Sequence, residues 1–280
     1  MVTHHSWPNR AVPVFDVRTR RLSLGPPPRA CSGQRYPSYL PLGDKLVSVD
    51  VGSTGLLHPP PPKGSGVEWT WHKLPRPPFR CIAVTSYAAH PDGRTVFFSV
   101  ESRDSAASTF ALDTESEVWT RLGDWRLPFF RQAHFDPELD AWVGLAGGRD
   151  TFGYLCSSDV PPSSSTGKAR QQPPVWKLGK EKMFCQDPAE QQCGATLAYM
   201  GSRSKFCLVQ HFSAIDEEYK DIEVDDEEDR PRRHLLRLTS FSLKYDKHGD
   251  LQASTQRQVQ CYELPHVVTP FPNDIRAFWM

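Results

Sequence analysis

Three cysteines and one histidine in the second half of the chain are the residues best suited to bind a metal ion. They are Cys185, Cys193, Cys207 and His211. Thiolate and imidazole groups are typical zinc ligands, and Cys207 and His211 would share one face if their segment is a strand. Paired zinc-binding cysteines, however, are separated by about two to four residues, and Cys185 and Cys193 are further apart. The spacing therefore favours buried thiols and an ordinary histidine, and we expect neither a metal ion nor a cofactor.

Two histidines and a group of carboxylates could act as acids or bases. His90 and His134 each stand two residues before an aspartate, where a turn is expected. Histidines at such a repeated position either line a channel mouth or fix the turn by hydrogen bonding, and the second role is the commoner one. Asp136, Glu138 and Asp140 lie in the later turn, where solvated capping is the default. The sequence contains no GxSxG, HExxH, GxGxxG or P-loop motif, so we expect no catalytic residues and no enzyme activity.

The elements that would position these residues are short strands in a repeated pattern. Between residues 108 and 148 an apolar strand twice enters a turn that begins with aspartate and twice leaves through a strand with tryptophan. The same spacing of six residues occurs in three pairs, Asp16 and Leu22, Asp113 and Trp119, and Asp136 and Trp142. Recurrence of one unit along a chain is typical of repeat folds.

The residues that close successive units recur at similar intervals. In chain order they are Leu22, Trp69, Trp119, Trp176 and Tyr262. The intervals are 47, 50, 57 and 86 residues, the last being lengthened by an acidic insertion. A period of about fifty residues is typical of kelch repeats. The sequence therefore predicts an all-β fold, a kelch-like β-propeller of about five four-stranded blades.

The closing aromatic residues are expected to fill the space between blades. Replacement of Trp119 or Trp176 by alanine would then cost about 3–5 kcal/mol. The first unit, residues 11–24, is only half a unit. Either strands from about 270–280 complete it and close the ring, or the ring is incomplete at the N-terminus.

Turn residues mark further details of the units. Asp92-Gly93 between two apolar runs predicts a hairpin. Residues 52–66 are rich in proline and glycine, which predicts a loop on the rim, and residues 67–71 are expected to form the closing strand of that unit.

The predicted domain organisation is a flexible tail at 1–10 followed by a propeller at 11–280. A Ser/Pro-rich loop at 157–174 and an acidic, disordered insertion at 214–233 interrupt it. Residues 216–229 contain ten acidic residues and one lysine, and the remainder of the chain has a net charge of +9 from 32 basic and 23 acidic residues. The insertion is read as a solvated loop, or as a segment that binds a basic face of this chain or of a partner.

Composition excludes several classes of function. Lysine and arginine together number 33, as do aspartate and glutamate, so no net charge favours nucleic acid or a membrane. No apolar run is long enough to span a bilayer, and the N-terminus lacks a secretory h-region. The seven cysteines are odd in number and lack a CxxC pair, which favours reduced thiols in the cytoplasm or nucleus. A monomer is expected.

Several segments resemble a plant family of propeller-like proteins of unknown function. They are VFDVRTRRLSLGPPP, TFALDTESEVWTRLGDWRLPF, FDPELDAWVGL, LTSFSLKYDKHGDLQ and AFWM. In addition, Gly147-Gly148 followed by Tyr154 and Trp176 resembles a kelch blade. The resemblance implies a kelch-like propeller similar to those joined to plant F-box domains, and it implies no catalytic residues. No F-box-like helical region precedes residue 11.

These observations favour a non-catalytic scaffold that binds an unknown protein partner through rim loops. One alternative is the substrate-receptor module of a ubiquitin ligase whose helical adaptor domain is lost or supplied by another chain. Another is a glycan-binding or enzymatic propeller that uses its central channel.

Overall fold

The chain is all β in the parts that the computed structural model describes. These parts are residues 12–16, 21–26, 38–62, 64–102, 105–163, 172–184, 190–215 and 232–264. They contain strands, turns and two short 3-10 helices, Cys81–Ala83 and Arg149–Thr151, and no α-helix. Within them, no helix has the length and apolarity needed to cross a bilayer. The predicted all-β class is therefore confirmed.

The strands form a series of antiparallel sheets, and in each of the first three four-stranded sheets the strands pair in the order in which they occur in the sequence. The first four-stranded sheet contains β3 (Ser38–Leu42), β4 (Lys45–Asp50), β5 (Ser53–Leu57) and β6 (His72–Leu74). The second contains β7 (Val84–Ala89), β8 (Thr95–Ser102), β9 (Ser105–Asp113) and β10 (Val118–Gly123). The third contains β11 (Phe129–Asp136), β12 (Ala141–Ala146), β13 (Tyr154–Ser158) and β14 (Trp176–Lys182).

The fourth sheet differs from the others in its last strand. It contains β15 (Glu190–Tyr199), β16 (Lys205–Ile215) and β17 (Arg232–Tyr245), and the long β17 pairs with both β18 (Leu251–Ala253) and β19 (Gln258–Glu263). A separate two-stranded sheet pairs β1 (Val12–Asp16) with β2 (Arg21–Gly25).

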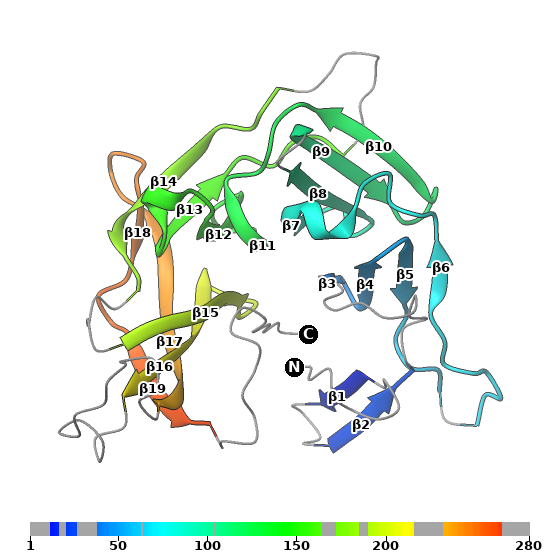
Figure 1. Ribbon diagram of the computed structural model, residues 1–280, viewed down its shortest axis with the longest axis horizontal. Helices are drawn as coiled ribbons and strands as arrows, with labels where there is room; N and C mark the ends of the chain where they lie inside the picture. The colour runs from blue at the N-terminus through cyan, green and yellow to red at the C-terminus, as the bar shows by residue number, and fades with distance from the viewer. Residues whose placement is uncertain are drawn as a thin grey trace, which may run out of the picture.

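The sheets are arranged around a common centre, with the first strand of each sheet nearest to it (Figure 1). Strands β7 and β11 pair in parallel, which joins the second and third sheets into one eight-stranded sheet. Strand β3 contacts β7, and β11 contacts β15. The two-stranded sheet of β1 and β2 lies between the fourth and first sheets (Figure 1). This radial arrangement is propeller-like, and it leaves only short outer edges.

Consecutive residues on one strand serve two different cores. Phe97 packs in the cluster between the second and third sheets, whereas Phe98 packs in the cluster between the first and second. On β12, Trp142 and Val143 are divided in the same way between the second–third and the third–fourth clusters. Because side chains alternate across a strand, a continuous apolar run indicates a strand that is buried on both faces.

The structure confirms some of the predicted turns and corrects others. Gly93 has a φ of 73° in the predicted hairpin turn. The segment at 52–66, however, is not all loop, since β5 occupies Ser53–Leu57. Residues 67–71 are not a strand, and the closing strand is β6. A Cβ added to Gly55 would lie 3.0 Å from the Trp71 ring. The glycine that made β5 look like a loop therefore permits this close contact.

Several predicted boundaries fall partly outside the described residues. Strand β16 continues to Ile215 and β17 begins at Arg232, so strands occupy the ends of the segment predicted as an acidic insertion at 214–233. Strand β13 likewise includes 157–158 of the predicted Ser/Pro loop. The tail at 1–10 and the closing segment at 270–280 lie outside the described residues.

Candidate functional site

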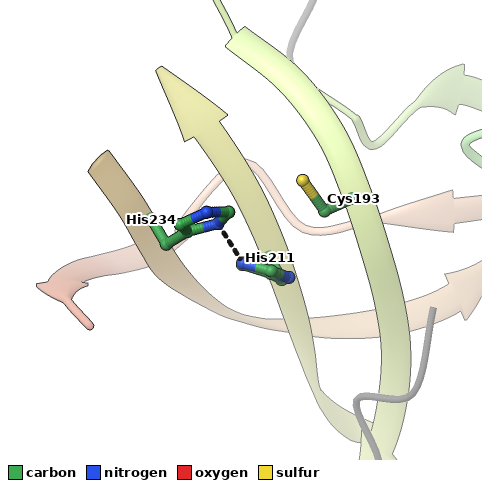
Figure 2. Close-up of side chains that lie close together, drawn as sticks. All are labelled: Cys193, His211 and His234. Atoms are coloured by element: carbon green, nitrogen blue, oxygen red, sulfur yellow. Dashed lines mark hydrogen bonds between the residues drawn. The ribbon is translucent and has the colours of Figure 1, made fainter. Parts of the chain in front are cut away.

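Side chains from three neighbouring strands of the fourth sheet come together in a cluster that could hold a metal ion. The cluster consists of Cys193 on β15, His211 on β16 and His234 on β17 (Figure 2). One potential ligand atom of each residue lies within 4.8 Å of the others. We call this group the Cys-His-His cluster.

Strand register brings the two histidines together. His211 pairs with Leu236 and Ser213 pairs with His234 across β16 and β17. Residues two apart on a strand face the same side of the sheet, so His211 and His234 are diagonal neighbours on one face. The two rings form a hydrogen bond, in which Nε2 of His211 and Nδ1 of His234 are 2.9 Å apart.

An irregularity in β15 brings Cys193 to the same place. Gln192 pairs with Phe212 and Gly194 pairs with His211, so the register shifts between them and Cys193 is the extra residue. A bulge of this kind leaves one residue out of the ladder and redirects its side chain. The sulfur of Cys193 thus lies beside His211 (Figure 2). The bulge, and not the regular alternation of side chains along a strand, gives Cys193 this position.

Burial makes His211 a neutral imidazole. The residue has no exposed surface, and this burial, with the neighbouring His234, lowers the pKa of His211 to about 4. Its Nδ1 atom is buried and has no hydrogen-bond partner among the described residues. A neutral ring with a free nitrogen can coordinate a metal ion. The Cys193 sulfur makes a weak hydrogen bond, with its Sγ atom 3.4 Å from the Gln191 carbonyl oxygen.

A small cavity borders Cys193 between the third and fourth sheets. Its volume is about 60 Å³, and its walls include Leu145, Phe152, Phe184 and Ala195. This volume holds a few water molecules. One member of the cluster, Cys193, therefore borders a small, partly open pocket.

The sequence identified two members of the cluster and missed the third. Cys207 stands four residues from His211 on the same strand, a separation of about 13 Å along β16, so it does not belong to the cluster. Cys185 lies outside the described residues. No sequence signal identified His234, because the strand register across residues 216–231 cannot be read from composition.

The two histidines that precede turns make structural contacts. The backbone N–H of Asp92 donates to Nδ1 of His90, at 3.1 Å, and the His90 ring stacks on Phe97. Nε2 of His134 is 2.7 Å from the Leu197 carbonyl oxygen and links the third sheet to the fourth. Burial lowers the pKa of His134 to about 4. These contacts show a turn-fixing role for His90 and an inter-sheet role for His134.

The aspartates of the repeat make the same turn in two places. Asp113 accepts hydrogen bonds from the backbone N–H groups two and three residues ahead, at 2.9 and 3.1 Å. Asp136 accepts the equivalent pair from Glu138 and Leu139, at 2.8 and 3.1 Å. Asp136 is also fully buried and accepts a hydrogen bond from Ser204, in the turn between β15 and β16 of the fourth sheet. Glu138 and Asp140 of the same turn are exposed.

Some predicted repeat tryptophans link adjacent sheets through the indole N–H. Trp142 is fully buried and donates to the Ala89 carbonyl at 2.8 Å. Trp119 donates to the Pro75 carbonyl at 3.0 Å. The corresponding bond one unit earlier is made by Trp71, which donates to Pro26 at 3.0 Å. Trp69, the residue predicted from spacing, donates instead to a nearby loop carbonyl.

Two predicted filler residues lie at the surface. Trp176 is 47% exposed and Tyr262 is 50% exposed, so the expectation that they fill the space between blades is wrong. Both belong to outer strands, β14 and β19, and the contact of β14 with β18 of the fourth sheet leaves Trp176 half exposed. Strands β1 and β2 contain Asp16 and Leu22, whose side chains are not among those described.

The double glycine is required by close packing. A Cβ on Gly147 would lie 2.6 Å from the carbonyl oxygen of Phe129, and one on Gly148 would lie 2.8 Å from the hydroxyl of Thr151. No larger residue fits at Gly147 without backbone movement.

Exposed apolar residues flank Trp176 in the sequence on the third sheet. Val175 is 66% exposed and Leu178 is 36% exposed. We call Val175, Trp176 and Leu178 the β14 surface. Trp176 also borders a hollow of about 240 Å³ whose other walls include Leu139 and Tyr245.

The fold and these contacts define the described part of the chain as an all-β, propeller-like protein. The family model described as "Protein of unknown function (DUF1668)" matches residues 1–262. The chain belongs to this family.

Other comparisons give only distant likenesses. No curated protein matches the sequence. TolB from Acinetobacter baumannii has a TM-score of 0.42 and 14% sequence identity, over 92% of this chain and 64% of that chain. Hydrazine synthase from Kuenenia stuttgartiensis has a TM-score of 0.35 and 10% identity, over 87% of this chain and 59% of that chain. This chain thus spans less than two thirds of the length of either protein.

Proposed function

We propose that this protein is a non-catalytic scaffold that binds a protein partner through the outer rim of its third sheet. The observation that supports the proposal most is the 47% exposure of Trp176 on β14. Tryptophan is enriched among the residues that dominate binding energy at protein interfaces. Exposed apolar side chains on either side of it extend the contact area, and the adjacent hollow can accept a partner side chain.

The position of β14 in the chain agrees with a rim interface. Residues 159–175 connect β13 to β14 and include most of the Ser/Pro-rich segment that we predicted to be a rim loop. Loops on a rigid scaffold commonly carry recognition. Asp140, Asp159 and Lys177 border the hollow and supply the polar margin that interfaces have around an apolar centre.

Partner capture with matched variants tests this proposal. The Trp176→Ala variant is compared with Tyr262→Ala, which removes an equally exposed aromatic residue from β19. We expect a stoichiometric partner with the wild type and with Tyr262→Ala, and loss of that partner with Trp176→Ala and with residues 159–174 replaced by a Gly/Ser linker. Equal capture by all four proteins, each with a wild-type circular dichroism spectrum, would rule out the β14 surface.

We further propose a kelch-like ring of about five blades, in which β1 and β2 are half of the fifth. The two-stranded sheet beside the first full sheet supports this arrangement. The scaffold is proposed to act as a monomer in the cytoplasm or nucleus, and the five described cysteines, all free thiols, agree with a reducing compartment. The zero net charge favours a protein partner over nucleic acid or a membrane.

A second candidate function is the binding of a small polar molecule such as a glycan. A hollow of about 200 Å³ on the first sheet is lined by Asp50, His72, Lys73 and Arg76. The hydroxyl of Thr54 in the same hollow is buried without a hydrogen-bond partner among the described residues. Glycan-array binding that is lost in His72→Ala would support this function. The ubiquitin-ligase role is still a prediction from resemblance.

A further inference from the structure

We propose that the Cys-His-His cluster binds one zinc ion, or a divalent transition metal of similar ligand preference, and fastens β15, β16 and β17 together. This site is independent of the partner surface on β14. The metal centre would either stabilise the fourth sheet or bind a further ligand. No sequence motif predicted such a centre.

The donor atoms select the class of metal. One sulfur and two imidazole nitrogens suit zinc and copper, whereas calcium and magnesium prefer oxygen ligands. Each of the three strands contributes one donor. A bound ion would therefore cross-link all three strands of the sheet at one point, a link that strand hydrogen bonds alone do not give.

The spacing of the histidines is close to that of a metal site. Nε2 of His211 and Nδ1 of His234 are 2.9 Å apart. Two nitrogens bound to one zinc ion with tetrahedral geometry are about 3.3 Å apart, given Zn–N bonds of about 2.0–2.1 Å. An ion could therefore replace the hydrogen bond after a shift of only a few tenths of an ångström.

The cysteine has the freedom to complete the site. The ligand atoms of the cluster lie within 4.8 Å of one another, whereas sulfur and nitrogen on one zinc ion are about 3.6 Å apart. Cys193 must therefore approach the histidines by up to about 1 Å. As the extra residue of the β15 bulge it takes no part in the strand pairing, so a side-chain rotation or a small backbone shift suffices.

Burial gives a second, independent reason for a ligand at this place. His211 has no exposed surface, and its Nδ1 atom has no partner among the described residues. Buried polar atoms are nearly always satisfied. Coordination through Nδ1 would satisfy this atom and keep the hydrogen bond between Nε2 and His234, whereas coordination through Nε2 would leave Nδ1 unpaired.

Three protein ligands leave one position of a tetrahedral ion open. Closed structural zinc sites have four protein ligands, and sites that accept water or a substrate have three. The cavity beside Cys193 is large enough for a water molecule as the fourth ligand. The described residues thus provide three ligands, one of which, Cys193, borders this pocket.

Cobalt titration of the chelator-treated full-length chain tests the proposal. Co²⁺ is a spectroscopic substitute for Zn²⁺, and a tetrahedral site with one thiolate gives intense visible bands and a sulfur-to-cobalt charge-transfer band. We expect one Co²⁺ per chain, displaced by stoichiometric Zn²⁺. Cys193→Ser should abolish the charge-transfer band and weaken binding at least about tenfold, and His234→Asn should weaken binding to a similar extent.

Cys261→Ser is the matched control, since Cys261 is an exposed free thiol on β19 of the same sheet. It should bind Co²⁺ as the wild type does. Excess Ca²⁺ distinguishes Co²⁺ bound at the cluster from Co²⁺ bound by the ten acidic residues at 216–229. Ca²⁺ would displace Co²⁺ from carboxylates but not from the cluster.

Each remaining outcome decides the question. Absence of the charge-transfer band in the wild type, equal loss in Cys261→Ser, or displacement of Co²⁺ by Ca²⁺ would overturn the proposal. If Cys193→Ser does not fold, retention of wild-type binding by His234→Asn would overturn it. Stronger binding of copper than of zinc, lost in Cys193→Ser, would support the site and change the metal.

Discussion

At the scale of single residues, the buried carboxylate of Asp136 shows how one side chain can hold a turn and two sheets. It accepts two backbone N–H groups in its own turn and the Ser204 hydroxyl of the neighbouring sheet. Asp113 makes the same turn without the inter-sheet bond. The comparison separates the contribution of the turn from that of the sheet contact.

Replacing each aspartate by alanine should therefore give unequal losses of stability. We expect Asp136→Ala to lower the free energy of unfolding by about 2–4 kcal/mol, because three hydrogen bonds to a buried side chain are lost. Asp113→Ala should cost about 1 kcal/mol, since water can replace its partially exposed carboxylate. Urea unfolding followed by tryptophan fluorescence measures both. Equal losses would show that the contact with Ser204 contributes nothing.

His134 predicts how stability depends on pH. Its folded-state pKa is lowered to about 4 by burial, whereas the unfolded value is about 6.5. Between these values the unfolded chain binds more protons, so stability falls as pH decreases. The expected loss from His134 is about 2 kcal/mol between pH 7 and pH 5. His134→Gln, which keeps an N–H donor, should remove this part of the pH dependence in urea unfolding. An unchanged dependence would contradict the assignment.

At the scale of the strands, the structure distinguishes buried from exposed aromatic residues in a way that the sequence does not. Phe97 and Phe98 are neighbours that pack into different inter-sheet clusters. Trp176 matches the repeat spacing and yet lies on an outer strand. Leu74 on β6 and Leu122 on β10 are buried although their strands are outer ones, so the contacts of each side chain decide its burial.

Alanine substitutions should follow this difference. Phe97→Ala and Phe98→Ala should each cost about 3–5 kcal/mol, because each leaves a cavity in a packed cluster. Trp176→Ala should cost less than about 1 kcal/mol, since solvent already covers half of its surface. Thermal unfolding of the three variants provides the comparison. A large loss in Trp176→Ala would place it in a core and remove the case for the β14 surface.

Local sequence signals predicted the hairpins well because their turns depend on residues close in sequence. Asp92, Asp113 and Asp136 each accept hydrogen bonds from backbone N–H groups two or three residues ahead. Such contacts can be predicted from the local sequence. Strand β5 was missed because its glycine, which fits beneath Trp71, resembles a loop signal. The choice between Trp69 and Trp71 depends on contact with Pro26, 45 residues away.

The candidate metal cluster was only partly predictable for the same reason. Cys193 and His211 were considered together, but the β15 bulge that brings them close is a feature of strand pairing. His234 follows residues 216–231 in the sequence. The length of that segment does not determine how β16 and β17 pair, so the sequence does not predict that His234 lies beside His211. Contacts between distant segments set this site, and spacing alone does not disclose them.

At the scale of the whole molecule, the apolar side chains of a sheet are shielded from water on both faces only if another sheet packs against each face. The first, second and third sheets share their clusters with neighbours, and the third shares one with the fourth. The fourth and first sheets lie on either side of the two-stranded sheet formed by β1 and β2 (Figure 1). A two-stranded hairpin alone is marginally stable in water, so β1 and β2 need neighbours to persist.

Hydrogen exchange of the backbone amides of β1 and β2 tests the ring of mutually packed sheets most directly. If the ring is closed, the amides of Val12–Asp16 and Arg21–Gly25 should exchange as slowly as those of β3 and β4, because global unfolding is then required. Exchange of these amides within seconds, with β3 and β4 still protected, would show an open ring and contradict the account.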